Sequence, residues 1–234
     1  MVELVPCHGS KGNGLLLACS CHAWLGGHMV KHLTILGLAT LLSVSSHNAQ
    51  DGKVMAGSVL SPTIKPWDSH YIDIEAGYLW KVGGDTPLDY GMVPVMLTWR
   101  SPEVIGMGFA DGSRLIVRNR LSLVAQWVET GAENHYFGLM GAPSIEWWNS
   151  AGTWSIYGGI GGGAGLIDSQ GVAGGQRRDL TLNWFGTVGV AHAINDTTQI
   201  RFGGMFQHLS NGGATTPNPG VNTLGFTVGM SRSF

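Results

Sequence analysis

A histidine and a serine two residues apart, His208 and Ser210, are the residues of this sequence best suited to chemistry. A serine hydroxyl becomes a nucleophile when a neighbouring base takes its proton. In a β-strand, residues two apart share a face with Cα atoms about 6.6 Å apart, so the imidazole can lean towards the hydroxyl. The pair indicates acyl transfer to water, with Ser210 as nucleophile and His208 as general base.

Polar residues after the pair supply the remaining parts of such a site. Asn222 lies on the next apolar segment and is placed to fix the tautomer of the imidazole. The run Asn211-Gly212-Gly213 follows Ser210, and its backbone N–H groups are candidate oxyanion donors, each worth about 3–4 kcal/mol. A His-x-Ser pattern also arises by chance. The alternative is therefore a set of polar residues tolerated where a membrane protein meets the headgroups.

Alternating segments, separated by turn residues, must position these side chains, and their alternation is typical of barrel strands. They span about 70–81, 90–100, 114–127, 135–146, 153–166, 180–192, 199–210 and 222–234. Eight is an even number, as bacterial barrels require. The last segment alternates up to Phe234, which resembles the C-terminal signal of outer-membrane proteins. The sequence predicts an all-β fold, an eight-stranded antiparallel transmembrane β-barrel of the outer membrane.

The direction of the site follows from the parity of the strands. In the segment 199–210, the apolar residues Ile200, Phe202 and Phe206 are even-numbered and must meet lipid. His208 and Ser210 share their parity and therefore point outward as well. Short connections at 149–152 and 194–198 fit periplasmic turns, and longer ones at 167–179 and 211–221 fit external loops. The long connection at 101–113 is a misfit, because it falls on the periplasmic side.

Composition limits the function classes. Charged residues make up only 12% of the chain, the net charge is -2 and no basic stripe is present, which argues against a nucleic-acid partner. The three cysteines all lie before residue 22, and we expect no metal site and no cofactor. The glycine-rich run 158–165 lacks the helix of a dinucleotide-binding unit, so close strand packing explains it better.

The interior of an eight-stranded barrel is filled by side chains. We therefore expect the inward charges to neutralise one another rather than to line a channel. These charges are Asp73, Glu75, Arg114, Arg118 and Arg120.

The N-terminal part is typical of export. Residues 29–49 have a lysine, a short apolar run and small residues, which together predict a signal peptide. Residues 1–28 then form a mis-assigned upstream extension; the alternative is a lipoprotein signal around Cys19. Residues 50–69 are expected to be an irregular periplasmic leader, and the barrel to occupy 70–234.

The residues of the candidate site resemble the lipid A 3-O-deacylase (PagL) family, also described as acyloxyacyl-hydrolase-like barrels. The resemblance lies in His208-Leu-Ser-Asn-Gly-Gly213, Pro217-Asn-Pro-Gly220, Asn222 and the final strand. It is specific over 200–234 and loose over 70–199. It implies an outward Ser–His–acid site that removes the 3-hydroxyacyl chain from position 3 of lipid A, with Gly213 N–H and the Asn218 side chain as oxyanion donors.

One position departs from the family pattern. Members carry a glutamate where this chain has Asn222, and no Asp or Glu follows Asp196. An amide can orient an imidazole but cannot stabilise an imidazolium by charge. Three outcomes stay open: a slower enzyme, an enzyme that recruits Asp168 or Asp179 from the neighbouring external loop, or an inactive one.

Partners and alternatives complete the expectations. The resemblance implies lipid A, or lipopolysaccharide, in the outer leaflet as the partner. Arg177 and Arg178 are candidates for holding its phosphates, and a solvated charge pair is the alternative. A homodimer is left open. The competing functions are a structural or adhesin-like barrel without chemistry and a lipid A acyltransferase.

Overall fold

The structure is a computed structural model that describes residues 65–234. The expected upstream extension 1–28, the signal peptide 29–49 and most of the leader 50–69 lie outside these residues. Within residues 65–234, no helix has the length and apolar character needed to cross a membrane.

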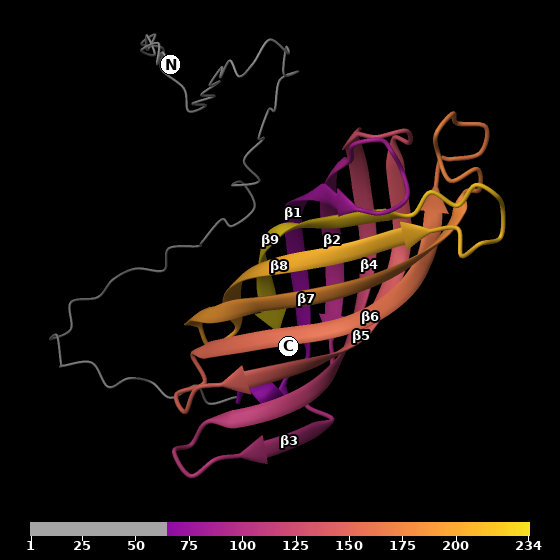
Figure 1. The fold of residues 1–234 in the computed structure, drawn as a ribbon. Helices are drawn as coiled ribbons and strands as arrows, with labels where there is room; N and C mark the ends of the chain where they lie inside the picture. Colours follow the sequence, from indigo (N-terminus) through magenta and orange to yellow (C-terminus); the bar gives the residue numbers. More distant parts are fainter. Residues whose placement is uncertain (1–64) are drawn as a thin grey trace, which may run out of the picture. The chain divides into compact units, whose positions relative to one another are not determined.

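Eight long strands close into an antiparallel barrel, as predicted (Figure 1). A ninth, short strand extends it at one end, and the 3-10 helix η1 (Pro66–Asp68) precedes the first strand. The strands in chain order are β1 (Tyr71–Gly83), β2 (Gly91–Arg100), β3 (Ile105–Gly108), β4 (Arg114–Thr130), β5 (His135–Trp148), β6 (Trp154–Ile167), β7 (Leu180–Asn195), β8 (Thr198–Ser210) and β9 (Val221–Ser233).

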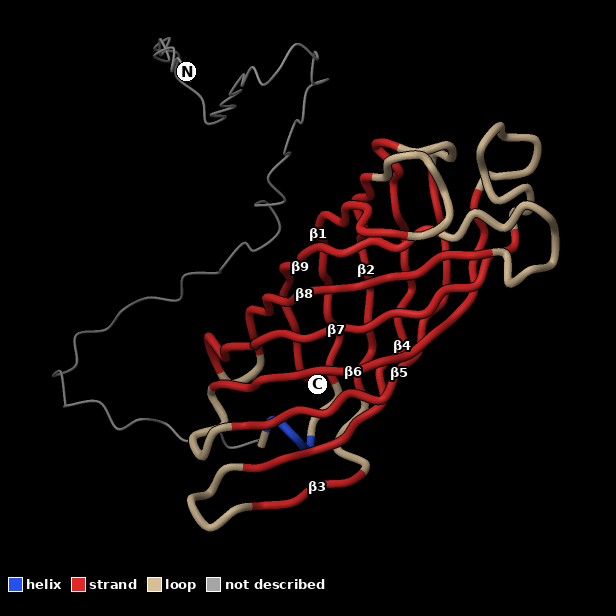
Figure 2. The backbone as a smooth tube through the Cα atoms, viewed as in Figure 1, coloured by secondary structure: helices blue, strands red, loops and turns tan. Residues whose placement is uncertain are grey.

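The barrel closes where β1 pairs with β9 and where β2 pairs with β4. The strand β3 explains the misfit at 101–113. That connection is not a plain turn, because Ile105 to Gly108 pair with Val117 to Arg114 and prolong the sheet beyond the end of β2 (Figure 2). One end of the barrel, which we call the turn end, carries this hairpin, the short turns and the C-terminus. The other, the loop end, carries the loops 84–90, 131–134, 168–179 and 211–220.

Strand alternation divides the side chains between lipid and lumen. On β8, Ile200 and Phe202 are exposed on the outer face, whereas Arg201 and Gln207 are buried inside. The glycine run on β6 serves close packing: a Cβ at Gly163 would overlap the carbonyl of Leu139 on β5. The outer wall is thus an apolar surface of the kind that lipid requires.

The turn-end half of the lumen is filled by ion pairs. Arg100 donates to Asp73 at 2.8 Å and to Glu146 at 3.1 Å, and all three side chains are fully buried. Further pairs join Arg118 to Glu146, Arg120 to Glu75, and Arg201 to both Asp73 and Glu75. Most of the expected neutralisation is confirmed. Arg114 is the exception, because it lies beyond the barrel and pairs with Glu103 beside β3.

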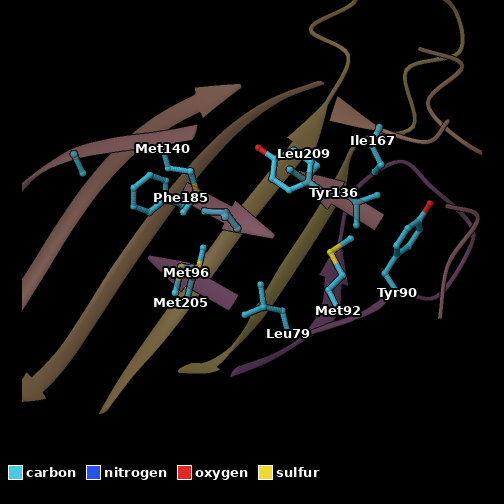
Figure 3. Packing of buried hydrophobic residues seen from close by; sticks show 13 residues of the cluster. Leu79, Tyr90, Met92, Met96, Tyr136, Met140, Ile167, Phe185, Met205 and Leu209 are labelled. Atoms are coloured by element: carbon cyan, nitrogen blue, oxygen red, sulfur yellow. The ribbon is translucent and has the colours of Figure 1, made fainter. Parts of the chain in front are cut away.

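The loop-end half of the lumen is filled mainly by apolar side chains, with uncharged polar groups such as the bonded pair Gln126 and Gln207 among them (Figure 3). Methionine, tyrosine, leucine and phenylalanine side chains from most strands pack there. The cluster includes Leu79, Met92, Met140, Phe185 and Leu209. It supports the loop end from below, and Leu209 places it directly behind the outward His208 and Ser210.

Candidate active site

The three residues of the candidate triad lie on the outer face of β8 and β9. His208, Ser210 and Asn222 are half-buried, while Gln207, Leu209 and Val221 beside them are buried inside. This is the parity predicted from the sequence. It puts all three polar side chains on the wall that faces lipid, within two residues of the loop-end strand termini.

His208 and Asn222 form the most definite contact of the site. They are direct cross-strand partners in the β8–β9 ladder, which brings their side chains onto one patch. The Nδ1–H of His208 donates to Oδ1 of Asn222 at 2.6 Å. This bond fixes the tautomer in which Nε2 carries a lone pair, the form that a general base needs.

Ser210 lies two residues further along β8, opposite Leu182 of β7. Its carbonyl oxygen accepts a hydrogen bond from Oγ1 of Thr181 at 2.8 Å, which holds the end of the strand. Within the described part of the chain, its hydroxyl makes no hydrogen bond to His208. Catalytic hydrogen bonds are often long before substrate binds and tighten only in the complex with substrate.

Gly220 limits where the imidazole can lie. A Cβ at this position would stand 2.9 Å from Cε1 of His208 and 3.6 Å from Nε2. A side chain at this position would therefore force the imidazole to move. On the opposite side, Trp184 of β7 is the cross-strand partner of His208 and stacks beside its ring at 6.0 Å between centroids.

Trp184 also indicates the depth of the site. Outward tryptophans lie within four residues of the loop ends of their strands at Trp80, Trp127 and Trp184. A second set marks the turn end, at Trp99, Trp147 and Trp154. Two such aromatic girdles mark the membrane interfaces of a barrel. Since His208 is in register with Trp184, the site lies at the level of the loop-end interface.

The loop 211–220 holds the candidate oxyanion donors. Asn211 is buried, and its Nδ2 donates to Thr215 and to Gln176 O. Its side chain therefore holds the loop 211–220 together and attaches it to the loop 168–179. The N–H of Gly213 already donates to Oδ1 of Asn211 at 2.9 Å. Asn218 accepts from the Asn211 N–H through Oδ1 at 2.9 Å. Within residues 65–234, Asn218 Nδ2 and Gly212 N–H are donors without a recorded partner.

The two acidic candidates of the loop 168–179 do not reach His208. Asp168 accepts hydrogen bonds from the N–H groups of Asn134 and His135. Burial raises the pKa of Asp168, but these bonds outweigh it and hold the pKa below its ordinary value. Asp179 accepts from two N–H groups of its own loop. Both carboxylates hold loop backbone, and Asn222 is the partner of the imidazole.

Arg177 and Arg178 lie exposed in the same loop. The backbone of Arg177 adopts a φ of 61°, a left-handed conformation that non-glycine residues rarely take. In the described residues, no cluster of three or more His, Cys, Asp or Glu side chains could hold a metal ion. His70 stacks between Trp99 and Phe234, and His192 lies against Trp154, in the turn-end girdle.

Sequence reasoning did not single out four residues that shape the site: Gly220, Trp184, Gln176 and Glu133. Gly220 and Trp184 carry a signal, because one belongs to the family-like Pro-Asn-Pro-Gly run and the other is an outward tryptophan. Gln176 and Glu133 carry none, since their roles depend on contacts between loops far apart in the chain.

The family model of lipid A 3-O-deacylase (PagL) matches residues 107–231. No protein with curated annotation matches the chain.

Among the solved structures similar to the chain are three outer-membrane proteins. The crystal structure of the outer membrane enzyme PagL is 18% identical, covering 67% of this chain and 97% of that one, with a TM-score of 0.49. Neisserial surface protein A (NspA) is 9% identical, covering 70% and 97%, with a TM-score of 0.47. The outer membrane protein OprG from Pseudomonas aeruginosa is 12% identical, covering 71% and 96%, with a TM-score of 0.36.

The family match spans more than half of the chain and includes His208, Ser210 and Asn222. The chain therefore belongs to the lipid A 3-O-deacylase (PagL) family, a family of outer-membrane hydrolases.

Proposed function

We propose that this protein hydrolyses the ester that links a 3-hydroxyacyl chain to position 3 of lipid A in the outer leaflet. The observation that carries the proposal is the 2.6 Å bond from His208 Nδ1 to Asn222 Oδ1 on the lipid-facing wall. It leaves Nε2 free as a base on the same face as Ser210. An acyl ester of the leaflet can reach that face without leaving the membrane.

The reaction starts when Nε2 of His208 takes the proton of Ser210 and the Oγ attacks the ester carbonyl. The negative charge on the carbonyl oxygen is stabilised by Asn218 Nδ2 and the N–H of Gly212. The C–O bond to the sugar then breaks, and His208 returns the proton to the leaving sugar oxygen. Water, activated by the same imidazole, releases the fatty acid from the acyl-enzyme and restores Ser210.

Asn222 supplies orientation without charge. Its carbonyl holds the tautomer, but it cannot offset the positive charge of the imidazolium as a carboxylate does. Of the three outcomes that the sequence leaves open, we therefore favour a slower enzyme. Asp168 and Asp179 are engaged by loop N–H groups and are not needed as substitutes.

The substrate would contact the protein on both sides of the loop-end membrane interface. Apolar side chains below the site, Phe206 and Leu224 on β8 and β9 and Trp184 on β7, offer a surface to the acyl chain. Above it, Arg177 and Arg178 are exposed and free to approach the phosphates of the headgroup. We further propose that residues 29–49 direct export. Whether the protein forms a homodimer is left open, since the proposed substrate contacts need only one copy of the chain.

The test is the mass of lipid A extracted from outer membranes that contain the protein. We expect the loss of one 3-hydroxyacyl group with the wild type, no loss with Ser210→Ala, and unchanged activity with the control Ser233→Ala at the turn end. Intact lipid A beside a correctly inserted wild-type barrel would refute the proposal and leave a structural role. A gain in mass would indicate an acyltransferase.

A further inference from the structure

Three external loops meet at one buried carboxylate that the reaction does not use. Glu133, in the loop 131–134, is only 3% exposed. It accepts hydrogen bonds from Tyr90 Oη at 2.7 Å, from Ser169 Oγ at 2.7 Å and from the N–H of Gln176 at 3.1 Å. Burial and the bond to this carboxylate raise the pKa of Tyr90, so the phenol keeps its proton and remains a donor.

Gln176 carries the connection onward to the catalytic loop. It is 1% exposed and lies between the Glu133 carboxylate and the loop 211–220. Its carbonyl accepts from Nδ2 of Asn211 at 2.9 Å, and its side-chain amide lies 2.9 Å from Oγ1 of Thr181. The same hydroxyl of Thr181 lies 2.8 Å from the carbonyl of Ser210.

The bonds therefore reach both sides of the nucleophile. Through Thr181 they reach the carbonyl of Ser210 itself. Through Asn211 they reach Gly213 and the Asn218 side chain, one of the proposed oxyanion donors. Gln176 also precedes Arg177, whose left-handed backbone needs support from its neighbours. One set of contacts thus fixes the loop that carries the basic pair and the loop that carries the oxyanion donors.

We propose that Glu133 and Gln176 are positioning residues, which join the loops 131–134, 168–179 and 211–220 into one rigid platform around Ser210. The inference rests on the proposed deacylase function. Neither residue touches the substrate. They hold the oxyanion donors and the loop 168–179 at a fixed distance from the nucleophile before the substrate arrives. Catalysis requires that these groups be positioned in advance.

The test compares three variants in the full-length barrel in detergent micelles. Glu133→Ala removes the acceptor, and Glu133→Gln keeps two acceptor bonds through Oε1 while its Nε2 can donate to Tyr90. Asp89→Ala, the control, removes an exposed acid from the loop 84–90. Hydrogen exchange of peptides covering 211–220 is measured together with kcat and KM on purified lipid A, per folded barrel.

We expect Glu133→Ala to lower kcat by about tenfold or more and to speed exchange in 211–220, with the strands unchanged. Glu133→Gln should recover most of both, and Asp89→Ala should alter neither. Equal exchange and kcat in Glu133→Ala and wild type would overturn the proposal. Faster exchange throughout the strands would do so too, because it would show a general loss of stability.

Two further controls keep the outcome decisive. If Glu133→Ala does not fold, Thr181→Val removes the hydroxyl between Gln176 and Ser210 with little change of shape, and the same loosening of 211–220 is expected. If the wild type removes no acyl chain, the proposed function fails. The exchange of 211–220 in Glu133→Ala still decides whether the platform exists.

Discussion

The turn-end lumen and the loop-end platform both bury polar groups, but they do so in opposite ways. In the lumen, four arginines face three carboxylates across strands, in a cluster of charges around Arg100, Arg201 and Asp73. At the loop end, a single carboxylate, Glu133, is satisfied by a phenol, a hydroxyl and a backbone N–H, and amides complete the network.

The difference reflects what already holds each region in place. Barrel strands are fixed by their ladders, so luminal side chains need only fill space and cancel charge. Loops have no ladder, and their positions depend on side-chain bonds one by one. The candidate site depends on both kinds of support: His208 and Asn222 are held by β8 and β9, whereas the oxyanion candidate Asn218 depends on its loop.

The largest expected effect is a loss of stability when a buried charge is removed from the lumen. Arg100→Met should destabilise the barrel by about 3–5 kcal/mol, because it removes the shortest ion pair of Asp73 and one of the two ion pairs of Glu146 from the buried lumen. Urea unfolding in micelles, followed by tryptophan fluorescence, measures this. Arg232→Met, on the exposed outer face of β9, is the control and should change stability by less than about 0.5 kcal/mol. Equal losses in both variants would contradict the role of the luminal charges.

The second largest expected effect is a gain of activity from changing Asn222, which is held by β9. Asn222→Asp keeps the side-chain length that reaches Nδ1 of His208 and adds the missing charge. We expect kcat to rise by well under the factor of about 10⁴ lost in the reverse change in a serine protease triad, because that loss came from the wrong tautomer and Asn222 already holds the right one. Asn222→Glu should gain as well. The double variant with Ser210→Ala should be inactive, and an unchanged kcat in both single variants would remove Asn222 from the triad.

A smaller loss is expected from crowding the imidazole. Gly220→Ala places a methyl group 2.9 Å from Cε1 of His208, so the ring must move, and kcat should fall by about tenfold. Gly204→Ala is a matched control on the outer face of β8, where the added Cβ meets nothing closer than 3.8 Å. Steady-state kinetics on lipid A decide between them. A similar kcat for the two alanine variants would show that Gly220 does not set the ring position.

The smallest expected effect concerns acid pH and Asp168, whose carboxylate accepts from the backbone at Asn134 and His135. The folded pKa of Asp168 lies below its ordinary value of 3.8. Its stabilising contribution is therefore complete above pH of about 4 and is lost as the pH falls through the folded pKa. The amide NMR shifts of Asn134 and His135, which donate to this carboxylate, should show a titration step in that acid range. In Asp168→Asn this acid step should be absent; a step that persists there would assign it to another group.

Much of the fold was predictable from the sequence because a lipid-facing strand repeats every two residues. The alternation on β8 and β9 predicted both the strands and the outward direction of His208 and Ser210. The strand β3 was not predicted: its four residues are exposed on both faces and show no apolar alternation. Arg114 was placed in the lumen because strand parity does not reveal where β4 outgrows the barrel.

The loop contacts were beyond sequence reasoning for a different reason. The bonds of Glu133 reach residues 43 and 36 positions away, and no local pattern encodes such partners. The same limit applies to the Gly213 N–H, expected as a free donor, which is engaged by Asn211. Residue type identified the candidates for chemistry, and tertiary contacts decide which donors remain available.

The alignment of His208 with the loop-end tryptophan girdle has a kinetic consequence. Enzyme and substrate share a two-dimensional phase, so collisions depend on the mole fraction of lipid A in that leaflet rather than on its bulk concentration. In mixed micelles, the rate should follow surface dilution: adding inert detergent at constant lipid A should slow the reaction. The deacylated lipid also stays in the plane after each turnover, where it competes for the same face of the barrel.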